Sequence, residues 1–156
     1  MKDKFKSAFM ETAQTFAKLS HARRLQVGAI VVKEDRIISI GYNGMPAGWD
    51  NVCEDEYLHE DGSSTLKTKS EVLHAETNAI AKLAKSNDSG NGATMFITHS
   101  PCIECAKLIY QSGINHVVYM QKYRDDAGIQ FLEQSGVTVE QVPAVNFQSI
   151  HSNSNQ

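Results

Sequence analysis

Two short stretches of the sequence carry side chains that could bind a metal ion. The motif LHAET offers the imidazole of His74 and the carboxyl group of Glu76. The motif SPCIECA offers two thiols, Cys102 and Cys105, at positions i and i+3. On a helix these thiols share one face, and a helix N-terminus favours their thiolate form. Two thiolates and one imidazole suit zinc, and three protein ligands leave a fourth position for water.

Each motif alone has other interpretations. A Cys-x-x-Cys pair can be a structural zinc half-site, a redox pair or two buried small residues. Glu76 by itself can be a solvated carboxylate in the first turn of a helix, where negative charge is favoured. Together, with Pro101 before the first cysteine, the motifs match the His-x-Glu and Pro-Cys-x-x-Cys pattern of zinc-dependent nucleobase deaminases. The combination therefore favours an open zinc site over the other interpretations.

Hydrophobic periodicity predicts the elements that position these residues. The pattern is α-β-β-α-β-α-β-α-β, with a tight Glu34–Asp35 turn between the first two strands and glycines 113 and 136 ending two helices with positive φ. The predicted ranges are helices over about 5–19, 75–84, 101–113 and 125–134, and strands over 27–33, 36–41, 93–99, 116–120 and 137–142. This order predicts an α/β fold, a three-layer α/β/α sandwich around a five-stranded mixed sheet.

The predicted order also explains how the two motifs meet. His74 lies at the start of one helix and the cysteines lie at the start of the next, with one short strand between them. Both helix N-termini can therefore converge at one end of the sheet.

The remaining segments are polar. Residues from about 50 to 70 lack apolar periodicity and predict a surface insertion, and residues from about 145 predict a ragged tail. We expect residues 1–156 to form a single deaminase domain, because this length supports one core.

Composition narrows the class of function. The formal charge is −3 and the lysines and arginines are scattered, so we expect no nucleic-acid or membrane partner. Three cysteines, two of them closely spaced, favour a reducing compartment. No apolar run approaches the length of a membrane span, and the amphipathic start does not fit a targeting peptide. We therefore expect a cytoplasmic protein with a small-molecule substrate.

The sequence resembles the deoxycytidylate (dCMP) deaminase family of the cytidine deaminase superfamily, particularly its phage and bacterial type. Residues 20–45 and 70–125 contain VGAIVV, GYNGMP, LHAETNAI and SPCIECAKLI in the family's order. The resemblance implies that His74, Cys102 and Cys105 bind one catalytic Zn²⁺. It also implies hydrolysis of dCMP to dUMP and ammonia, which supplies dUMP for thymidylate synthesis. Glu76 would take a proton from the attacking water, protonate N3 of the cytosine and help deliver a proton to the leaving amine.

Several residues are candidates for contacts to the nucleoside. The amide of Asn43 could bind a sugar hydroxyl or simply stabilise a turn, since asparagine tolerates the αL conformation. The resemblance favours the deoxyribose 3′-hydroxyl as its partner. It also implies that Val27 and Ala29 lie under the base, and that Ser100 and the backbone of Ala75 meet the pyrimidine edge.

Two further positions are candidates for closing the site. Arg24, next to Arg23, could bind the phosphate because a guanidinium pairs bidentately with it, although a solvated surface pair is the alternative. Tyr123, before Arg124, lies where the superfamily closes its pocket and could cover the substrate or be a half-buried core tyrosine.

The resemblance further implies a homo-oligomer, a hexamer in many relatives, activated by dCTP and inhibited by dTTP with Mg²⁺ on the triphosphate. Tyr42 and Gly44 lie in the segment that corresponds to the effector loop, where a simple turn is the alternative.

A second zinc is the less favoured prediction. Cys53, His59 and His21 could contribute ligands, as in some phage-type relatives. In this sequence, however, Ser64 and Thr68 replace the upstream histidines of those relatives.

Two alternative functions stay open at this stage. One is another zinc deaminase acting on cytidine, cytosine or tRNA adenosine, although the acidic charge opposes tRNA binding. The other is a catalytically silent module that binds zinc or nucleotides, which would have no need of Glu76.

Overall fold

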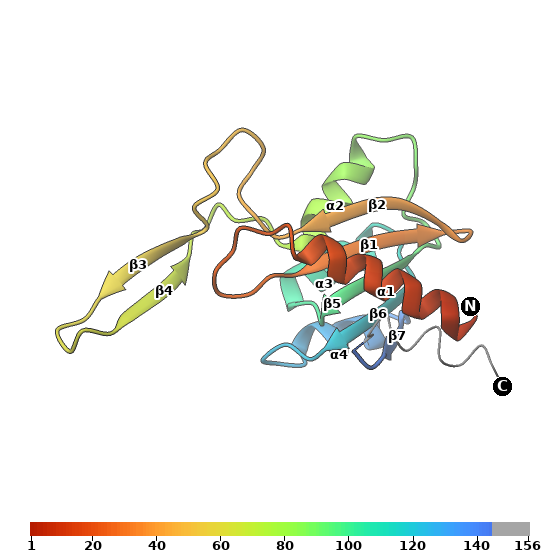
Figure 1. Ribbon diagram of the computed structural model, residues 1–156. Coiled ribbons are helices and arrows are strands. Elements are labelled where there is room, and N and C mark those ends of the chain that lie inside the picture. Colours follow the sequence, from red (N-terminus) through yellow and green to blue (C-terminus); the bar gives the residue numbers. More distant parts are fainter. Residues whose placement is uncertain (145–156) are drawn as a thin grey trace, which may run out of the picture.

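The computed structural model describes residues 1–144 and contains four helices and seven strands in that range (Figure 1). The helices are α1 (Asp3–Ala17), α2 (Ala75–Ala84), α3 (Ile103–Gln111) and α4 (Ala127–Gln134). The strands are β1 (Gly28–Lys33), β2 (Arg36–Tyr42), β3 (Glu54–Leu58), β4 (Ser64–Thr68), β5 (Thr94–His99), β6 (His116–Gln121) and β7 (Thr138–Gln141). The predicted tail from about residue 145 lies outside the described residues.

Five strands form the main sheet in the order β2-β1-β5-β6-β7. The first three pair antiparallel and the last three pair parallel, which confirms the predicted five-stranded mixed sheet. The turn between β1 and β2 has positive φ at both Glu34 and Asp35, as a tight hairpin requires. With these directions, the first residue of β1 lies at the same edge of the sheet as the last residues of β2, β5 and β6. That edge carries the site described below.

Helices cover both faces of the main sheet (Figure 1). Successive residues of the buried strand β1 point in opposite directions, so Ala29 and Val31 pack with α2, α3 and α4, while Ile30 and Val32 pack with α1. Phe96 of the central strand β5 joins the α1 side and is fully buried. The predicted three-layer α/β/α sandwich is confirmed, with one helix on one face and three on the other.

Glycines bring two helices unusually close to the sheet. A Cβ on Gly41 of β2 would lie 2.2 Å from the carbonyl oxygen of Ala75 and 2.6 Å from the amide nitrogen of Ala79, both in α2. A Cβ on Gly28 of β1 would lie 2.0 Å from the carbonyl oxygen of Ala13 in α1. The absence of a side chain at Gly41 therefore fixes how the start of α2 sits on the sheet.

The polar segment at 50–70 differs from the prediction, because it contains two strands. β3 and β4 pair only with each other and project from the sheet as an isolated hairpin (Figure 1). Their side chains are mostly exposed on both faces, so the sequence shows no alternation of apolar and polar residues. Only its base enters the body of the protein, where Cys53 and Glu54 are buried.

Helix boundaries also differ slightly from prediction. α1 ends at Ala17, before Leu19, and α4 begins at Ala127. α3 begins at Ile103, so Cys102 precedes the helix instead of lying within it. Within residues 1–144, no helix combines the length and apolar character needed to cross a bilayer.

Candidate metal centre and nucleotide pocket

Three potential zinc ligands meet where α2 and α3 begin. His74 and Cys102 are the residues immediately before these helices, and both have extended backbone conformations. Cys105 lies in the first turn of α3 and is buried. The imidazole and thiol ligand atoms of these three residues all lie within 4.8 Å of one another. The structure thus forms the predicted cluster, although Cys102 reaches it from the residue preceding the helix.

The spacing of these atoms fits a zinc ion. Nδ1 of His74 lies 3.2 Å from Sγ of Cys105 and 3.7 Å from Sγ of Cys102. Tetrahedral zinc with Zn–S bonds of about 2.3 Å and Zn–N bonds of about 2.05 Å places nitrogen and sulfur about 3.6 Å apart. The donor set therefore fits zinc both in its chemistry and in its separation, with Nδ1 as the histidine ligand.

The electrostatics of the cluster favour a thiolate. Hydrogen bonds from Cys105 and His74 lower the pKa of Cys102 to about 4. The same contact with Cys102, together with burial, raises the pKa of Cys105 well above its usual range. The hydrogen bond with Cys102 also raises the pKa of His74. Cys102 is therefore the thiol that ionises more readily, its thiolate would attract a cation, and a bound cation would favour loss of the Cys105 proton.

Glu76 lies beside this cluster in a nearly water-free position. It is the second residue of α2, its side chain is only 4% exposed, and it faces the same cavity as His74 and Cys102. Burial raises the pKa of its carboxyl group. A carboxyl group whose pKa is raised in this way holds a proton more readily than an exposed one, which suits a group that accepts and returns protons.

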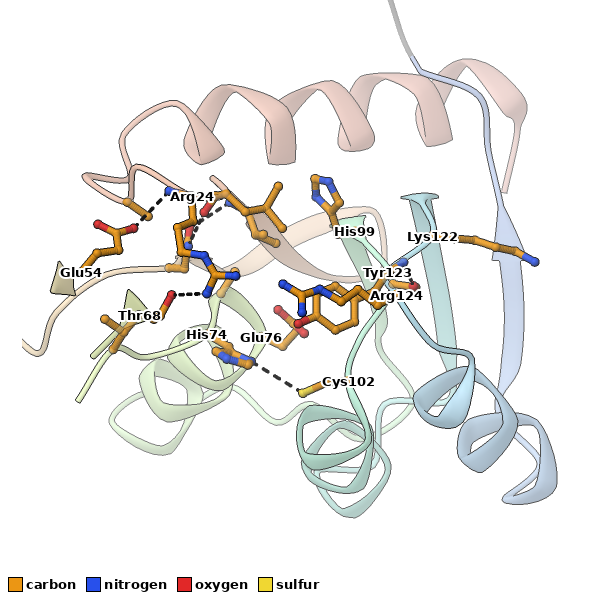
Figure 2. A pocket seen from close by; sticks show the side chains of 17 residues that line it. Arg24, Glu54, Thr68, His74, Glu76, His99, Cys102, Lys122, Tyr123 and Arg124 are labelled. Carbon is orange, nitrogen blue, oxygen red and sulfur yellow. Dashed lines mark hydrogen bonds between the residues drawn. The ribbon is translucent and has the colours of Figure 1, made fainter. Parts of the chain in front are cut away.

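The cluster opens into a cavity of about 370 Å³ (Figure 2). Six of the seven residues predicted to contact substrate line this cavity: Arg24, Val27, Asn43, Ala75, Ser100 and Tyr123. They come from the loop before β1, the end of β2, the start of α2 and the segments after β5 and β6. The other predicted floor residue, Ala29, is fully buried in the sheet and is not among the lining residues.

Two of these residues already make contacts within the protein. Oδ1 of Asn43 accepts the backbone N–H of Val27 at 2.9 Å, and its Nδ2 donates to the carbonyl of Leu25 at 2.7 Å. Asn43 does not have positive φ, so the turn does not use the αL conformation that asparagine tolerates. One N–H and one lone pair of its amide are free of these two bonds. Ser100 accepts the backbone N–H of Tyr123 at 2.6 Å, which holds the tyrosine beside the cavity.

The cavity wall also contains five polar or charged residues that the sequence analysis did not assign to substrate contacts. They are Glu54, Thr68, His99, Lys122 and Arg124. In Figure 2, Tyr123 and Arg124 point toward Glu76, whereas Lys122 points away. Glu54 and Thr68 belong to the base of the β3–β4 hairpin. No local motif marks them, because their position depends on pairing between strands that the sequence did not reveal.

The predicted effector residues and second-metal residues lie elsewhere. Tyr42 and Gly44 do not line the cavity beside the cluster. Within residues 1–144, the His74 cluster is the one group of three or more metal-type ligands that lie close together. His59, near the tip of the hairpin, hydrogen-bonds to Thr65, and Cys53 is buried at the hairpin's base.

Comparisons with known proteins agree with this geometry. Residues 3–121 match the family described as the cytidine and deoxycytidylate deaminase zinc-binding region. The chain is 40% identical to ComE operon protein 2 of Bacillus subtilis, covering 86% of this chain and 69% of that protein. It is 38% identical to the human deoxycytidylate deaminase, covering 95% and 88% of the two chains. A crystal structure of dCMP deaminase from the cyanophage S-TIM5, in complex with dCMP and dUMP, is 47% identical, with a TM-score of 0.81 over 91% of this chain and 99% of that one.

Proposed function

Because the chain belongs to the cytidine and deoxycytidylate deaminase family, we propose that it catalyses the zinc-dependent hydrolysis of dCMP to dUMP and ammonia. The observation that carries this proposal is the His74, Cys102 and Cys105 cluster beside buried Glu76, in a cavity that also contains an arginine. A module that only binds zinc or nucleotides would not need a buried carboxyl group at an open metal site.

The reaction needs a nucleophile and a group that moves protons. His74, Cys102 and Cys105 would hold the zinc ion, which would lower the pKa of a bound water molecule to about 7 and so make hydroxide available at neutral pH. Glu76 would accept one proton from this water and pass it to N3 of the cytosine ring while the water oxygen bonds to C4. Glu76 would then help move the remaining hydroxyl proton to the amino group on C4, so that the C4–N bond breaks, ammonia leaves and the C4 carbonyl of dUMP forms. Burial of Glu76 excludes bulk water that would compete for these protons.

The other wall residues orient the nucleoside. Val27 contacts the base, while Ser100 and the backbone of Ala75 face the edge of the pyrimidine nearest the metal. The remaining N–H of the Asn43 amide donates to the 3′-hydroxyl of the deoxyribose. Tyr123 covers the bound nucleotide, since its backbone is held by Ser100.

Arg24 binds the 5′-phosphate. It is an exposed cation at the rim of the cavity, and a guanidinium has several donors arranged for two phosphate oxygens. Recognition of the phosphate distinguishes dCMP from deoxycytidine and places its deamination directly before thymidylate formation.

Regulation is a further part of the proposal. We assign dCTP activation and dTTP inhibition, with Mg²⁺ on the triphosphate, to the segment that includes Tyr42 and Gly44. A second cavity of about 480 Å³ supports this assignment, because its wall includes Met45, the residue after Gly44, and two lysines, Lys67 and Lys69. Its carboxylates, Asp50, Asp55 and Glu71, are oxygen ligands of the kind Mg²⁺ prefers.

We also propose a cytoplasmic enzyme formed by one deaminase domain that assembles into a homo-oligomer, with a hexamer as the expected state. Exposed apolar side chains on α3, namely Ile103, Leu108 and Tyr110, support association between copies. Light scattering of the purified protein, with and without nucleotides, measures the number of subunits directly.

Ammonia release tests the function. We expect turnover of dCMP, with much lower catalytic efficiency on deoxycytidine and CMP, and a rate that dTTP reduces and dCTP increases. The same assay with dCTP as substrate shows whether the triphosphate is also deaminated. No ammonia from dCMP by zinc-loaded protein would refute the proposal, and release from cytidine, cytosine or tRNA adenosine instead would identify a different zinc deaminase.

A further inference from the structure

The loop that carries Arg24 is held from two sides. Asn43, at the end of β2, bonds to the backbone of Leu25 and Val27 and so fixes the second half of this loop. The first half contains Arg23 and Arg24, and its contacts come from the β3–β4 hairpin. Two separate segments, the end of β2 and the β3–β4 hairpin, therefore fix the backbone position from which the Arg24 side chain extends.

Glu54 supplies the contact to the first half. One oxygen of its carboxylate accepts the backbone N–H groups of both Arg23, at 2.8 Å, and Arg24, at 3.1 Å. Figure 2 shows the bond to Arg24. Glu54 is only 6% exposed, although it is the first residue of an otherwise exposed strand. Hydrogen bonds to an ionised group are about twice as strong as neutral ones, so this carboxylate is an effective anchor for the loop.

The facing strand of the hairpin holds the other end of Arg24. Thr68 pairs with Glu54 in the register of β3 and β4. Its hydroxyl accepts a hydrogen bond from Nη1 of Arg24 at 3.2 Å. The remaining donors of the guanidinium are free of this bond and can bind an anion in the cavity. The backbone and the guanidinium of Arg24 are thus both held by one cross-strand pair at the base of the hairpin, Glu54 and Thr68.

We propose that Glu54 is a positioning residue for phosphate recognition: by fixing the backbone of Arg23 and Arg24, it places the Arg24 guanidinium where the 5′-phosphate of the nucleotide binds. This inference rests on the proposed function and extends it to the hairpin. In this arrangement the hairpin contributes to substrate selection through its base, without touching the reacting atoms.

The ratio of KM values for dCMP and deoxycytidine tests this role, because only dCMP has the phosphate. We expect Glu54→Ala to raise this ratio about tenfold or more, with kcat for dCMP nearly unchanged, since a lost charge-assisted anchor leaves Arg24 poorly oriented. Glu54→Gln keeps an acceptor oxygen but loses the charge, so we expect a smaller rise of about two- to fivefold.

A matched control separates loss of the Glu54 contact from any general effect of mutating the hairpin. Glu56 is two residues away on the same strand, and its exposed carboxylate pairs with the side chain of Arg23 at 3.3 Å. Glu56→Gln should leave the KM ratio unchanged. In a double-mutant cycle, Glu54→Ala should add little to Arg24→Ala, because both changes remove the same contact with phosphate.

Different failures have different signatures. If wild-type protein does not deaminate dCMP, the proposed function itself is wrong. If wild type prefers dCMP but the Glu54 variants change KM equally for both substrates, Glu54 has only a structural role and this inference is wrong. Should Glu54→Ala fail to fold, an unchanged KM ratio in folded Glu54→Gln would overturn the inference by itself.

Discussion

The end of the main sheet and the β3–β4 hairpin differ in how they are packed. At the sheet end, the proposed zinc ligands and Glu76 lie next to helix starts that pack on strands buried on both faces. The hairpin has no sheet beneath it, and Leu58 near its tip is 82% exposed. The proposed chemistry therefore sits on the well-packed part of the molecule, where small errors of position would be costly.

The hairpin instead reaches the cavity only through its base, where Glu54 and Thr68 line the wall. Its base contains Cys53 and Glu54, which are both buried, whereas the rest of β3 is exposed. This contrast assigns the reaction to the sheet and part of the substrate selection to the hairpin base. Each prediction below changes one of the two regions and compares the outcome with a matched change in the other or at an equivalent position.

Loss of a zinc ligand should have the largest effect. Cys105→Ser replaces a thiolate by a weak hydroxyl ligand, so we expect zinc content to fall far below one ion per chain and dCMP deamination to be abolished. Cys53→Ala, at the hairpin base, should keep one zinc per chain and the activity. Elemental analysis and ammonia release check both variants, and a wild-type content of two ions that falls to one in Cys53→Ala would reveal a second site.

Loss of the proton-transfer group should come next. Glu76→Gln preserves size but removes the base, and we expect kcat to fall by roughly 10²–10⁴-fold with zinc retained. Glu104 is the matched control, because it is the second residue of α3 as Glu76 is of α2, yet it is exposed and pairs with Lys107. Glu104→Gln should have normal kcat. A Glu76→Gln enzyme with zinc and full activity would contradict the assigned role.

A larger side chain at Gly41, between β2 and α2, should have an intermediate effect on stability and activity. Gly41→Ala forces a methyl group against the backbone of Ala75 and Ala79, so α2, which carries Glu76, must shift. Overpacking of this kind costs about 1–3 kcal/mol, which corresponds to a decrease in Tm of about 3–10 °C. We also expect a lower kcat, since the start of α2 moves relative to Cys102.

Gly44 provides the comparison for thermal stability. A Cβ at Gly44 meets no atom within 4 Å, and its φ is not in the left-handed region. Gly44→Ala should therefore have the Tm of wild type in a thermal unfolding measurement. Equal Tm values for the two alanine variants would show that α2 is not confined by its contact with β2.

The same contrast explains what the sequence could predict. The clustering of His74, Cys102 and Cys105 beside Glu76 could be predicted because these residues stand beside helix starts, within two short motifs separated by one strand. The five-stranded sheet was predicted correctly because its central strands are continuous apolar runs that must be buried. Local patterns carry this information directly.

Other features depend on pairings between distant residues. The roles of Glu54 and Thr68 follow from the register of two mostly exposed strands and from their contact with a loop about 30 to 44 residues away. The bonds of Asn43 to Leu25 and Val27 likewise arise from the return of β2 along β1. Neither strand propensity nor motif spacing indicates such contacts, because exposed hairpins show no hydrophobic alternation.

Shortening the hairpin should have the smallest effect on activity. It tests most directly whether the hairpin acts through its base alone. Glu56 and Leu66 face each other in the register, so residues 57–65 can be replaced by an Asn-Gly turn that closes the two strands. Glu54 and Thr68 stay in place, and we expect zinc content and kcat like those of wild type, with KM for dCMP within about threefold. Steady-state kinetics of the shortened enzyme give these values. A large loss of kcat would show that the outer hairpin also contributes to the reaction centre, whereas an unchanged enzyme would confine its contribution to the base.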